Sequence, residues 1–266
     1  MNQDNQGYGK TALITGASGG IGAELARLFA KDVTNLILVA RSKDKLDELK
    51  TELEAPHNIS VTVFAEDLTR QDAAQRLYDF TQTQHLSVDF LVNNAGFGDW
   101  GLFADCNLEK QQQMMQLNIV TLTNLTKLFL PQMISRKSGR ILNVASVASF
   151  MPGAKMSVYY ASKAFVRSFS EALSVELKQT KSGVTVTALC PGPVKTDFWN
   201  RAEAEKSSIF SHMLFATSDF IARYGYKKML NGKPLAIPGI TTQAAVLLTK
   251  VLPRSWVRNM VYFVQK

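Results

Sequence analysis

The chain has 266 residues, a formal net charge of +8 and a hydrophobic content of 46%, which suffices for a large core. No apolar run of about 18 residues is free of charge, so no membrane-spanning helix is expected. Residues 1–10 are polar and lack the apolar core of a signal peptide. Cys106, Cys190 and three scattered histidines lack metal-ligand spacing. We therefore expect a cytoplasmic protein with two buried or half-buried free thiols and no metal site.

The positive charge is concentrated towards the C-terminus. Residues 220–266 contain no Asp or Glu, and their basic residues account for the whole excess: Arg223, Lys227, Lys228, Lys233, Lys250, Arg254, Arg258 and Lys266. Such a region suits an acidic protein, a phosphorylated substrate or an anionic membrane, and equally a solvated face that aids solubility. We expect no nucleic-acid partner.

Apolar runs alternate with amphipathic runs along the chain. Buried strands are predicted at residues 10–15, 35–40, 59–64, 88–93, 140–145 and 184–189. Helices are predicted at residues 23–31, 43–54, 69–84, 108–133 and about 157–178, the third opened by a capping box of Thr69 and Asp72. Strands that are apolar throughout predict a parallel sheet covered on both faces, and therefore a doubly wound α/β fold in three layers. We expect one domain over residues 1–266, with an apolar lid at about 193–216 and a basic helical segment at about 217–266.

A glycine-rich loop follows the first predicted strand. Gly16, Gly20 and Gly22 allow a tight turn and a close approach of the backbone to a pyrophosphate, next to the N-terminus of the following helix. Many such turns need glycine for backbone reasons only, but the position after a first strand and before a helix favours dinucleotide binding.

The end of the second predicted strand favours NADP(H) over NAD(H). A carboxylate at this position usually holds the 2′-hydroxyl of NAD, whereas a basic residue holds the 2′-phosphate of NADP. The chain offers Arg41 there, and the first acid is Asp44, inside the next helix. The alternative is a solvated arginine at a strand end.

Two further strand ends carry polar residues. Asp67 and Leu68 follow the third strand, where a carboxylate can accept a hydrogen bond from adenine while the leucine packs on the ring; an acid preceding a helix is the alternative. The fourth strand ends in Asn93, Asn94, Ala95 and Gly96. These amides suit either a flat ligand or hydrogen bonds between neighbouring strand ends.

Tyr159 and Lys163 are four residues apart and share one side of a predicted helix. An ammonium beside a phenol favours the phenolate, so we predict a lowered pKa for Tyr159. Ser146 follows the fifth strand and can lie beside the phenol. The spacing alone is weak evidence, because Tyr224 and Lys228 also match it; there we predict a solvated helix face.

Taken together, the motifs resemble those of the short-chain dehydrogenase/reductase family in its compact single-domain form. They occur in register over residues 10–196, and the likeness beyond is diffuse: Thr15-Gly16-Ala17-Ser18-Gly19-Gly20-Ile21-Gly22, Asp67-Leu68, Asn93-Asn94-Ala95-Gly96, Ser146, Tyr159-Tyr160-Ala161-Ser162-Lys163 and Pro191-Gly192-Pro193-Val194-Lys195-Thr196. The resemblance implies a Rossmann fold that exchanges hydride between a nicotinamide cofactor and a carbonyl or alcohol.

The resemblance also implies residue roles. Tyr159 would be the acid and base, Lys163 would bind the nicotinamide ribose, Ser146 would hold the substrate oxygen, and Asn118 would anchor a water leading to Lys163. The remaining implied cofactor contacts are Gly16, Ser18, Gly20, Ile21, Gly22, Arg41, Asp67, Leu68, Asn94, Ala95, Gly96, Pro191, Gly192, Val194 and Thr196. Many members have two serines where this chain has Ala145 and Ser146, and the catalytic one is kept.

The substrate is expected to be a hydrophobic ketone or secondary alcohol. Large apolar residues without a charged anchor follow the strand ends: Phe97, Trp100, Phe150, Met151, Met156, Phe198, Trp199, Ile209, Phe210, Met213, Leu214 and Phe215. Several of them can instead pack the lid onto the body. The rival substrate is a 3-oxoacyl carrier protein, whose acidity suits the basic C-terminal region, and a non-catalytic nucleotide sensor is a remote alternative.

The C-terminal residues 241–266 read as a basic amphipathic helix. We favour packing within an oligomer or over the pocket, with peripheral membrane contact second. The family usually forms dimers or tetramers through two long helices, and the Tyr159 helix offers Phe165, Phe169 and Leu173 for this; they can instead be core.

Overall fold

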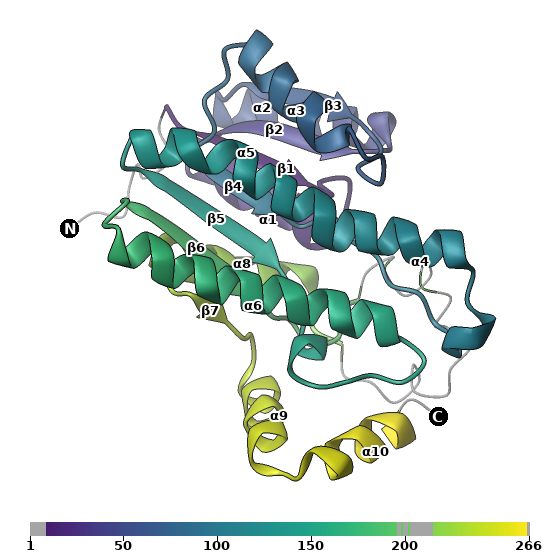
Figure 1. Ribbon diagram of the computed structural model, residues 1–266. Helices are drawn as coiled ribbons and strands as arrows, with labels where there is room; N and C mark the ends of the chain where they lie inside the picture. The colour runs from purple at the N-terminus through teal and green to yellow at the C-terminus, as the bar shows by residue number, and fades with distance from the viewer. Residues whose placement is uncertain (1–8, 196–197, 199–201, 203–214, 265–266) are drawn as a thin grey trace.

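The computed structural model describes residues 9–195, 198, 202 and 215–264. The strands form one parallel sheet in the order β3-β2-β1-β4-β5-β6-β7 (Figure 1). Their bounds are β1 Thr11–Thr15, β2 Asn35–Ala40, β3 Val61–Ala65, β4 Phe90–Asn93, β5 Gly139–Val144, β6 Val184–Leu189 and β7 Leu235–Ala236. Strand order reverses beside β1, which pairs with both β2 and β4. Ligands of doubly wound sheets bind at such a switch point.

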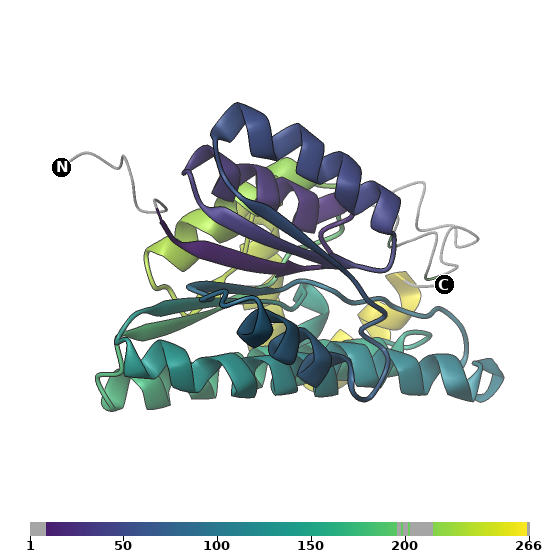
Figure 2. The ribbon, with the colours of Figure 1, turned by 90° about the horizontal axis from the view of Figure 1, so that it is seen from above.

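Helices cover both faces of the sheet, as predicted (Figure 2). Side chains of β1 and β2 alternate between the faces: Ile14 and Leu38 pack in one core cluster, and Leu13 and Ile37 in the other. The first cluster includes residues of α1 (Gly20–Lys31), α2 (Lys43–His57) and α8 (Ser218–Leu230). The second includes residues of α3 (Ala73–Thr83), α5 (Leu122–Ser135) and α6 (Ser157–Gln179). β1, β2, β4, β5 and β6 are thus buried along nearly their whole length, which explains their apolar sequences, whereas only Val61 is fully buried in β3 at the sheet edge.

The predicted helix at 108–133 is continuous but not uniform. It comprises α4 (Leu108–Met115), a π-helical turn η2 (Gln116–Thr121) and α5, and it ends at Ser135. Short 3-10 turns lie at Phe103–Asp105 and Val147–Phe150. π-Turns inside helices frequently mark functional sites, and η2 carries Asn118.

Two local predictions were wrong. The capping box is absent, because α3 begins at Ala73 and the Thr69 hydroxyl instead donates to Asp67 Oδ1 at 2.9 Å. Tyr224 and Lys228 do not form a solvated face: Tyr224 is half-buried against the core, and Lys228 Nζ lies 5.2 Å from the centre of its ring. The two-residue strand β7 was not predicted.

The C-terminal segment consists of two helices that extend beyond the sheet, α9 (Ile240–Val251) and α10 (Arg254–Val264) (Figure 1). Val246, Val257 and Val261 are buried. The exposed residues include both apolar and basic side chains: Ile240, Leu247, Leu248, Val251, Trp256, Met260, Tyr262, Phe263, Lys250, Arg254 and Arg258. Within the described ranges no helix is long and apolar enough to cross a membrane.

The cysteine prediction is confirmed. Cys190 is buried, Cys106 is half-buried, and both are free thiols. Among the described residues no group of three or more His, Cys, Asp or Glu side chains is placed to hold a metal ion.

Candidate active site

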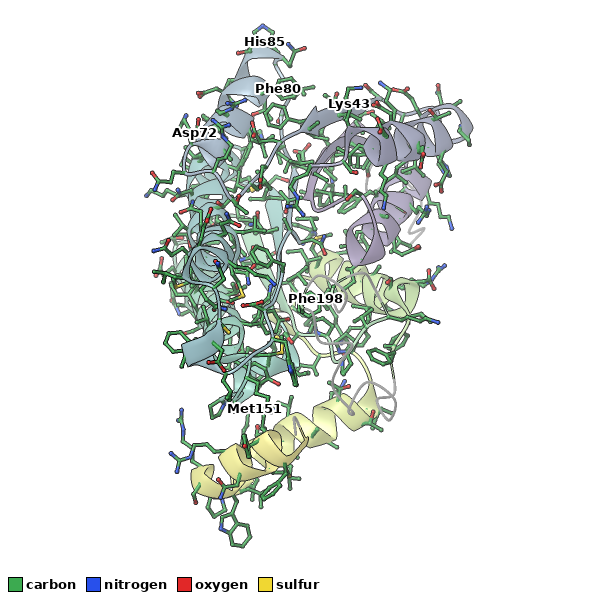
Figure 3. The ribbon with its side chains drawn as sticks, turned by 90° about the vertical axis from the view of Figure 1, so that its right-hand side faces the viewer. Lys43, Asp72, Phe80, His85, Met151 and Phe198 are labelled. Carbon is green, nitrogen blue, oxygen red and sulfur yellow. The ribbon has the colours of Figure 1, made fainter. Side chains whose placement is uncertain are left out.

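A cavity of about 1010 Å³ opens at the carboxyl ends of the central strands. Figure 3 looks onto this end of the molecule, with Phe198 near its centre. Most of the predicted site residues line this one cavity: Gly16, Ser18, Gly20, Ile21, Arg41, Asp67, Leu68, Asn94, Ala95, Gly96, Ser146, Tyr159, Lys163, Pro191, Gly192 and Val194. Gly22 and Asn118 lie behind its wall, and Thr196 is outside the described residues.

The glycine loop leads from β1 into the N-terminus of α1. Gly16 and Gly20 have φ values of 67° and 55°, in the left-handed region that favours glycine. A Cβ on Gly22 would collide with the carbonyl oxygen of Gly16, so this residue lets helix and loop approach closely. Gly19 lines the cavity, and a Cβ there would meet no atom of the described residues within 4 Å. The loop thus leaves open space in front of the free N–H groups of α1, which suits a phosphate.

The ends of β1 and β4 are joined by side-chain hydrogen bonds. Thr15 Oγ1 accepts from the backbone N–H groups of Asn94 and Ala95, each at 3.0 Å, and donates to Val92 O at 3.2 Å. Asn94 Nδ2 donates to Thr15 O at 2.9 Å and Gly16 O at 3.2 Å. Of the two roles that the sequence left open for these amides, Asn94 thus has the one between strand ends. It also lines the cavity.

Asn93 links the next pair of strands in a similar way. Its amide nitrogen donates to Asn143 Oδ1 at 2.9 Å and to Thr126 Oγ1 at 3.1 Å, which ties β4 to β5 and α5. Asn93 is 3% exposed, so its amide is structural and not available to a ligand in the cavity.

Arg41, Asp67 and Leu68 form one end of the cavity. Arg41 is exposed and, within the part of the chain that the structure describes, makes no ion pair. Asp67 Oδ1 accepts from both Thr69 N and Thr69 Oγ1. The Leu68 carbonyl accepts from Thr121 Oγ1 at 2.8 Å, which fixes this end against η2.

Tyr159, Ser146 and Lys163 lie at the other end. Tyr159 is only 9% exposed and shares a side-chain hydrogen bond with Ser146. Burial raises the pKa of Tyr159 well above its ordinary value, and the Ser146 bond only partly opposes this. The predicted lowering of the pKa of Tyr159 by Lys163 is therefore wrong for this structure.

Burial acts on Lys163 in the opposite direction. It lowers the pKa of Lys163 to about 8, because a buried ammonium loses its hydration. Lys163 Nζ donates to the Val144 carbonyl at 2.9 Å and lies 5.8 Å from the centre of the Tyr159 ring. The lysine is thus fixed to the end of β5, beside the phenol but not bonded to it.

Asn118 reaches the site from η2 and is 1% exposed. Its Oδ1 accepts from Phe97 N at 3.2 Å, while its Nδ2 donates to Phe97 O at 3.0 Å and Ser162 Oγ at 3.1 Å. A Cβ on Gly96 would lie 2.9 Å from Asn118 Oδ1 and 3.2 Å from Lys163 Nζ. Asn118 and Lys163 therefore flank the same glycine, Gly96. The residues around Asn118 in the sequence do not indicate that it lies near Lys163.

The apolar predictions had mixed outcomes. Phe97, Met151, Met156 and Phe198 line the cavity, and Trp100 packs behind them. Phe150 was wrongly placed: its ring lies 4.3 Å from the Arg167 guanidinium carbon and packs in a separate cluster. Phe215 is described but does not line the cavity, and the remaining predicted residues lie outside the described ranges: Trp199, Ile209, Phe210, Met213 and Leu214.

Some cavity residues were missed. Lys110, Gln113 and Leu117 reach the wall from α4 and η2, and Tyr160 lies beside Tyr159. The signal available for the first three was their spacing of three and four residues, which places them on one helix face.

The chain is similar in sequence to known proteins. The model of the short chain dehydrogenase family matches residues 10–207. Oxidoreductase UcpA of Salmonella typhimurium is 41% identical over 193 residues, 71% of this chain and 70% of that protein. Ketoacyl reductase HetN of a Nostoc species is 36% identical over 186 residues, 70% of this chain and 64% of that protein.

Solved structures agree with these matches. A short-chain dehydrogenase from Sphingobium yanoikuyae in complex with NADPH has a TM-score of 0.80 at 30% identity, covering 92% of this chain and 97% of that chain. A bulky-bulky ketone specific alcohol dehydrogenase from Comamonas testosteroni has a TM-score of 0.76 at 28% identity, covering 92% and 96%. Structures of the same fold include complexes with NAD as well as with NADPH.

A doubly wound sheet with a glycine loop and a Tyr-Lys-Ser set in one cavity defines a nicotinamide-dependent oxidoreductase. The chain belongs to the short-chain dehydrogenase/reductase family, whose members act on carbonyl and alcohol groups and generally form oligomers.

The pKa of Lys163 predicts a pH dependence. Lys163 is an ammonium below about pH 8 and a neutral amine above it, whereas Tyr159 stays neutral throughout this range because its pKa is raised. We expect kcat/KM for carbonyl reduction to fall above about pH 8, approaching tenfold per pH unit, as the ammonium beside the phenol is lost.

An NMR titration of the lysine Nζ groups gives a direct check. One resonance should titrate near pH 8, below the ordinary lysine value of about 10.4, and should disappear in Lys163→Met. A Lys163 midpoint at that ordinary value would contradict the effect of burial.

Proposed function

We propose that the protein is an NADP(H)-dependent reductase of hydrophobic ketones that also oxidises the corresponding secondary alcohols. The observation that carries the proposal is one cavity with the exposed Arg41 at its nucleotide end and the buried Tyr159 and half-buried Ser146 at its apolar end. Phe97, Met156 and Phe198 surround that end, so an apolar substituent gains by leaving water there.

The residues fit the cofactor. The open space at Gly19 and the N-terminus of α1 suit the pyrophosphate. The Arg41 guanidinium suits a 2′-phosphate, since its planar donors can bind two phosphate oxygens at once. Asp67 and Leu68 would hold adenine, and Lys163 would hold the nicotinamide ribose. The bound nicotinamide supplies or accepts the hydride.

The chain's own residues position the carbonyl and move the proton. Ser146 and Tyr159 donate hydrogen bonds to the carbonyl oxygen and hold its carbon towards the cofactor side of the cavity. As negative charge develops on that oxygen, Tyr159 gives up its proton, and the Lys163 ammonium stabilises the phenolate left behind. A phenol whose pKa is raised is fully protonated before reaction, which suits reduction. We further propose that Asn118 anchors a water that returns the proton through Lys163.

Removal of the phenolic hydroxyl tests this mechanism. Tyr159→Phe should lower kcat by roughly 10³-fold or more, because the group that transfers its proton to the carbonyl oxygen is removed and only the Ser146 hydrogen bond remains. NADPH affinity, measured by fluorescence titration, should change by less than about threefold, since the ring and Lys163 remain. The neighbouring Tyr160→Phe is the matched control and should retain most of the activity. A near-normal kcat in Tyr159→Phe would refute the mechanism.

Cofactor preference depends on Arg41. Arg41→Gln should weaken NADPH binding by roughly 10- to 100-fold through loss of charged hydrogen bonds to the 2′-phosphate. NADH has no such phosphate and should bind nearly as before. Lys45→Gln removes a nearby charge that does not line the cavity and should leave both affinities unchanged. An equal decrease in the affinities for NADPH and NADH would show that Arg41 does not bind the 2′-phosphate.

A second candidate is reduction of a 3-oxoacyl group on an acidic carrier protein. The relative named ketoacyl reductase and the absence of acidic residues from 220 to 266 favour it. Screening by salt would then raise KM for an acyl-carrier substrate steeply, while KM for a free apolar ketone stays nearly constant. Equal salt dependence of the two KM values would exclude carrier recognition by this region.

We also propose that the protein forms a dimer or tetramer through its long helices. Phe165 and Val175 on α6 are 40% and 60% exposed, and Val120 and Ile134 on the neighbouring long helix are similarly exposed. Phe169 and Leu173 are half-buried against the core and contribute less to this face than the sequence suggested.

A further inference from the structure

Gly98 is a buried glycine whose backbone does not require glycine. Its φ lies outside the left-handed region, in contrast to Gly16 and Gly20. A Cβ at this position would lie 2.8 Å from Cζ of Phe198 and 3.0 Å from Cε of Met156. Both distances are shorter than carbon–carbon contacts normally are. The missing side chain at residue 98 is thus the space into which the tip of the Phe198 ring fits.

Phe198 lies between Gly98 and the catalytic tyrosine. Its ring centre is 5.2 Å from that of Tyr159, with the ring planes tilted by 52°. It lines the same cavity as Met151 and Met156 (Figure 3). The position of this ring therefore decides how much room remains beside the Tyr159 hydroxyl.

The backbone around Gly98 is fixed. The next residue, Asp99, is 6% exposed. Its carboxylate accepts a hydrogen bond from Gln111 Nε2 at 2.5 Å and forms an ion pair with Lys110 Nζ at 2.7 Å, both on α4. Trp100 N donates to Ala202 O at 3.0 Å, and Gly101 N donates to Lys155 O at 2.8 Å. The segment 98–101 is therefore held by three separate parts of the chain.

The Phe198 side is linked to the same segment. Ala202 O accepts from Trp100 N, and Ala202 N donates to Phe198 O at 2.9 Å. The atoms that a Cβ on residue 98 would meet are the ends of two side chains, Cζ of Phe198 and Cε of Met156. We therefore expect these side-chain ends to move when residue 98 gains a Cβ.

We propose that Gly98 is a specificity-determining residue that, by lacking a side chain, seats the Phe198 ring beside Tyr159 and leaves room for a ketone with two large apolar substituents. This inference rests on the proposed function and narrows its substrate class. Filling residue 98 pushes the Phe198 ring towards Tyr159 and reduces the space for the second substituent, while a methyl ketone still fits.

The test is a double-mutant cycle of Gly98→Ala and Phe198→Ala. The readout is the ratio of kcat/KM for a diaryl ketone to that for a methyl aryl ketone, with NADPH. Gly98→Ala should lower this ratio by about fivefold or more, as expected for crowding an apolar pocket by one carbon. In the Phe198→Ala background the same change should alter the ratio by less than about twofold, because the ring that transmits it is gone.

Thermal unfolding of the same four proteins provides a readout without turnover. Gly98→Ala should lower Tm by roughly 3–6 °C when Phe198 is present, because the added carbon overpacks the site. In the Phe198→Ala background the decrease in Tm should be much smaller. Gly101→Ala is the matched control: it lies in the same segment, and among the described residues its Cβ would meet only Cys106 Sγ, at 3.2 Å. It should leave the ketone ratio unchanged.

The outcomes separate the two proposals. If the parent enzyme reduces no ketone of the panel, the proposed function fails and this inference fails with it. If it reduces both ketones but Gly98→Ala leaves the ratio unchanged, or shifts it equally in both backgrounds, only this inference is overturned. The two substitutions could also be coupled in their effect on Tm but not in their effect on the ketone ratio. Residue 98 would then pack against Phe198 without controlling specificity, and this inference would be overturned.

Discussion

The hydrogen bonds of Thr15 hold together the two strands at which the sheet order reverses. One hydroxyl satisfies the backbone N–H groups of both Asn94 and Ala95, and the Asn94 amide returns two bonds to the end of β1. The glycine loop and the segment that flanks Lys163 are thereby fixed in one arrangement. Since a buried N–H without a partner is costly, this connection also explains why both strand ends can carry polar residues in an apolar core.

Burial tunes the two ionisable groups of the site in the same sense. It favours the neutral form of each, raising the pKa of Tyr159 and lowering that of Lys163. Below about pH 8 the phenol is neutral and the lysine is an ammonium. In the proposed mechanism, the Tyr159 proton and the Lys163 charge then act at the carbonyl oxygen without an ion pair between the two groups that must first be broken.

The strands were predictable from sequence because burial on both faces leaves an apolar run in most of them. Most cofactor motifs were predictable because they sit at strand ends, and Tyr159 and Lys163 because of their helical spacing. β7 escaped prediction because two residues carry no periodicity. Thr69 and Phe150 were misassigned because the residue types fit a cap and a pocket, whereas a local turn contact to Asp67 and a more distant contact to Arg167 decided otherwise. The pKa of Tyr159 depends on enclosure, and the proposed role of Gly98 depends on a ring one hundred residues later; neither is visible in a local pattern.

The π-turn η2 determines how far α4 is rotated about the helix axis relative to α5. One extra residue in a turn rotates everything before it by about 100° relative to a regular helix. α5 is anchored by Leu125 and Phe129 in the core, so the turn decides which face of α4 meets the cavity. Lys110 and Gln111 owe their alignment with Asp99 to this rotation. An insertion or deletion in this one turn would thus change which α4 residues line the cavity, while the core register stays unchanged.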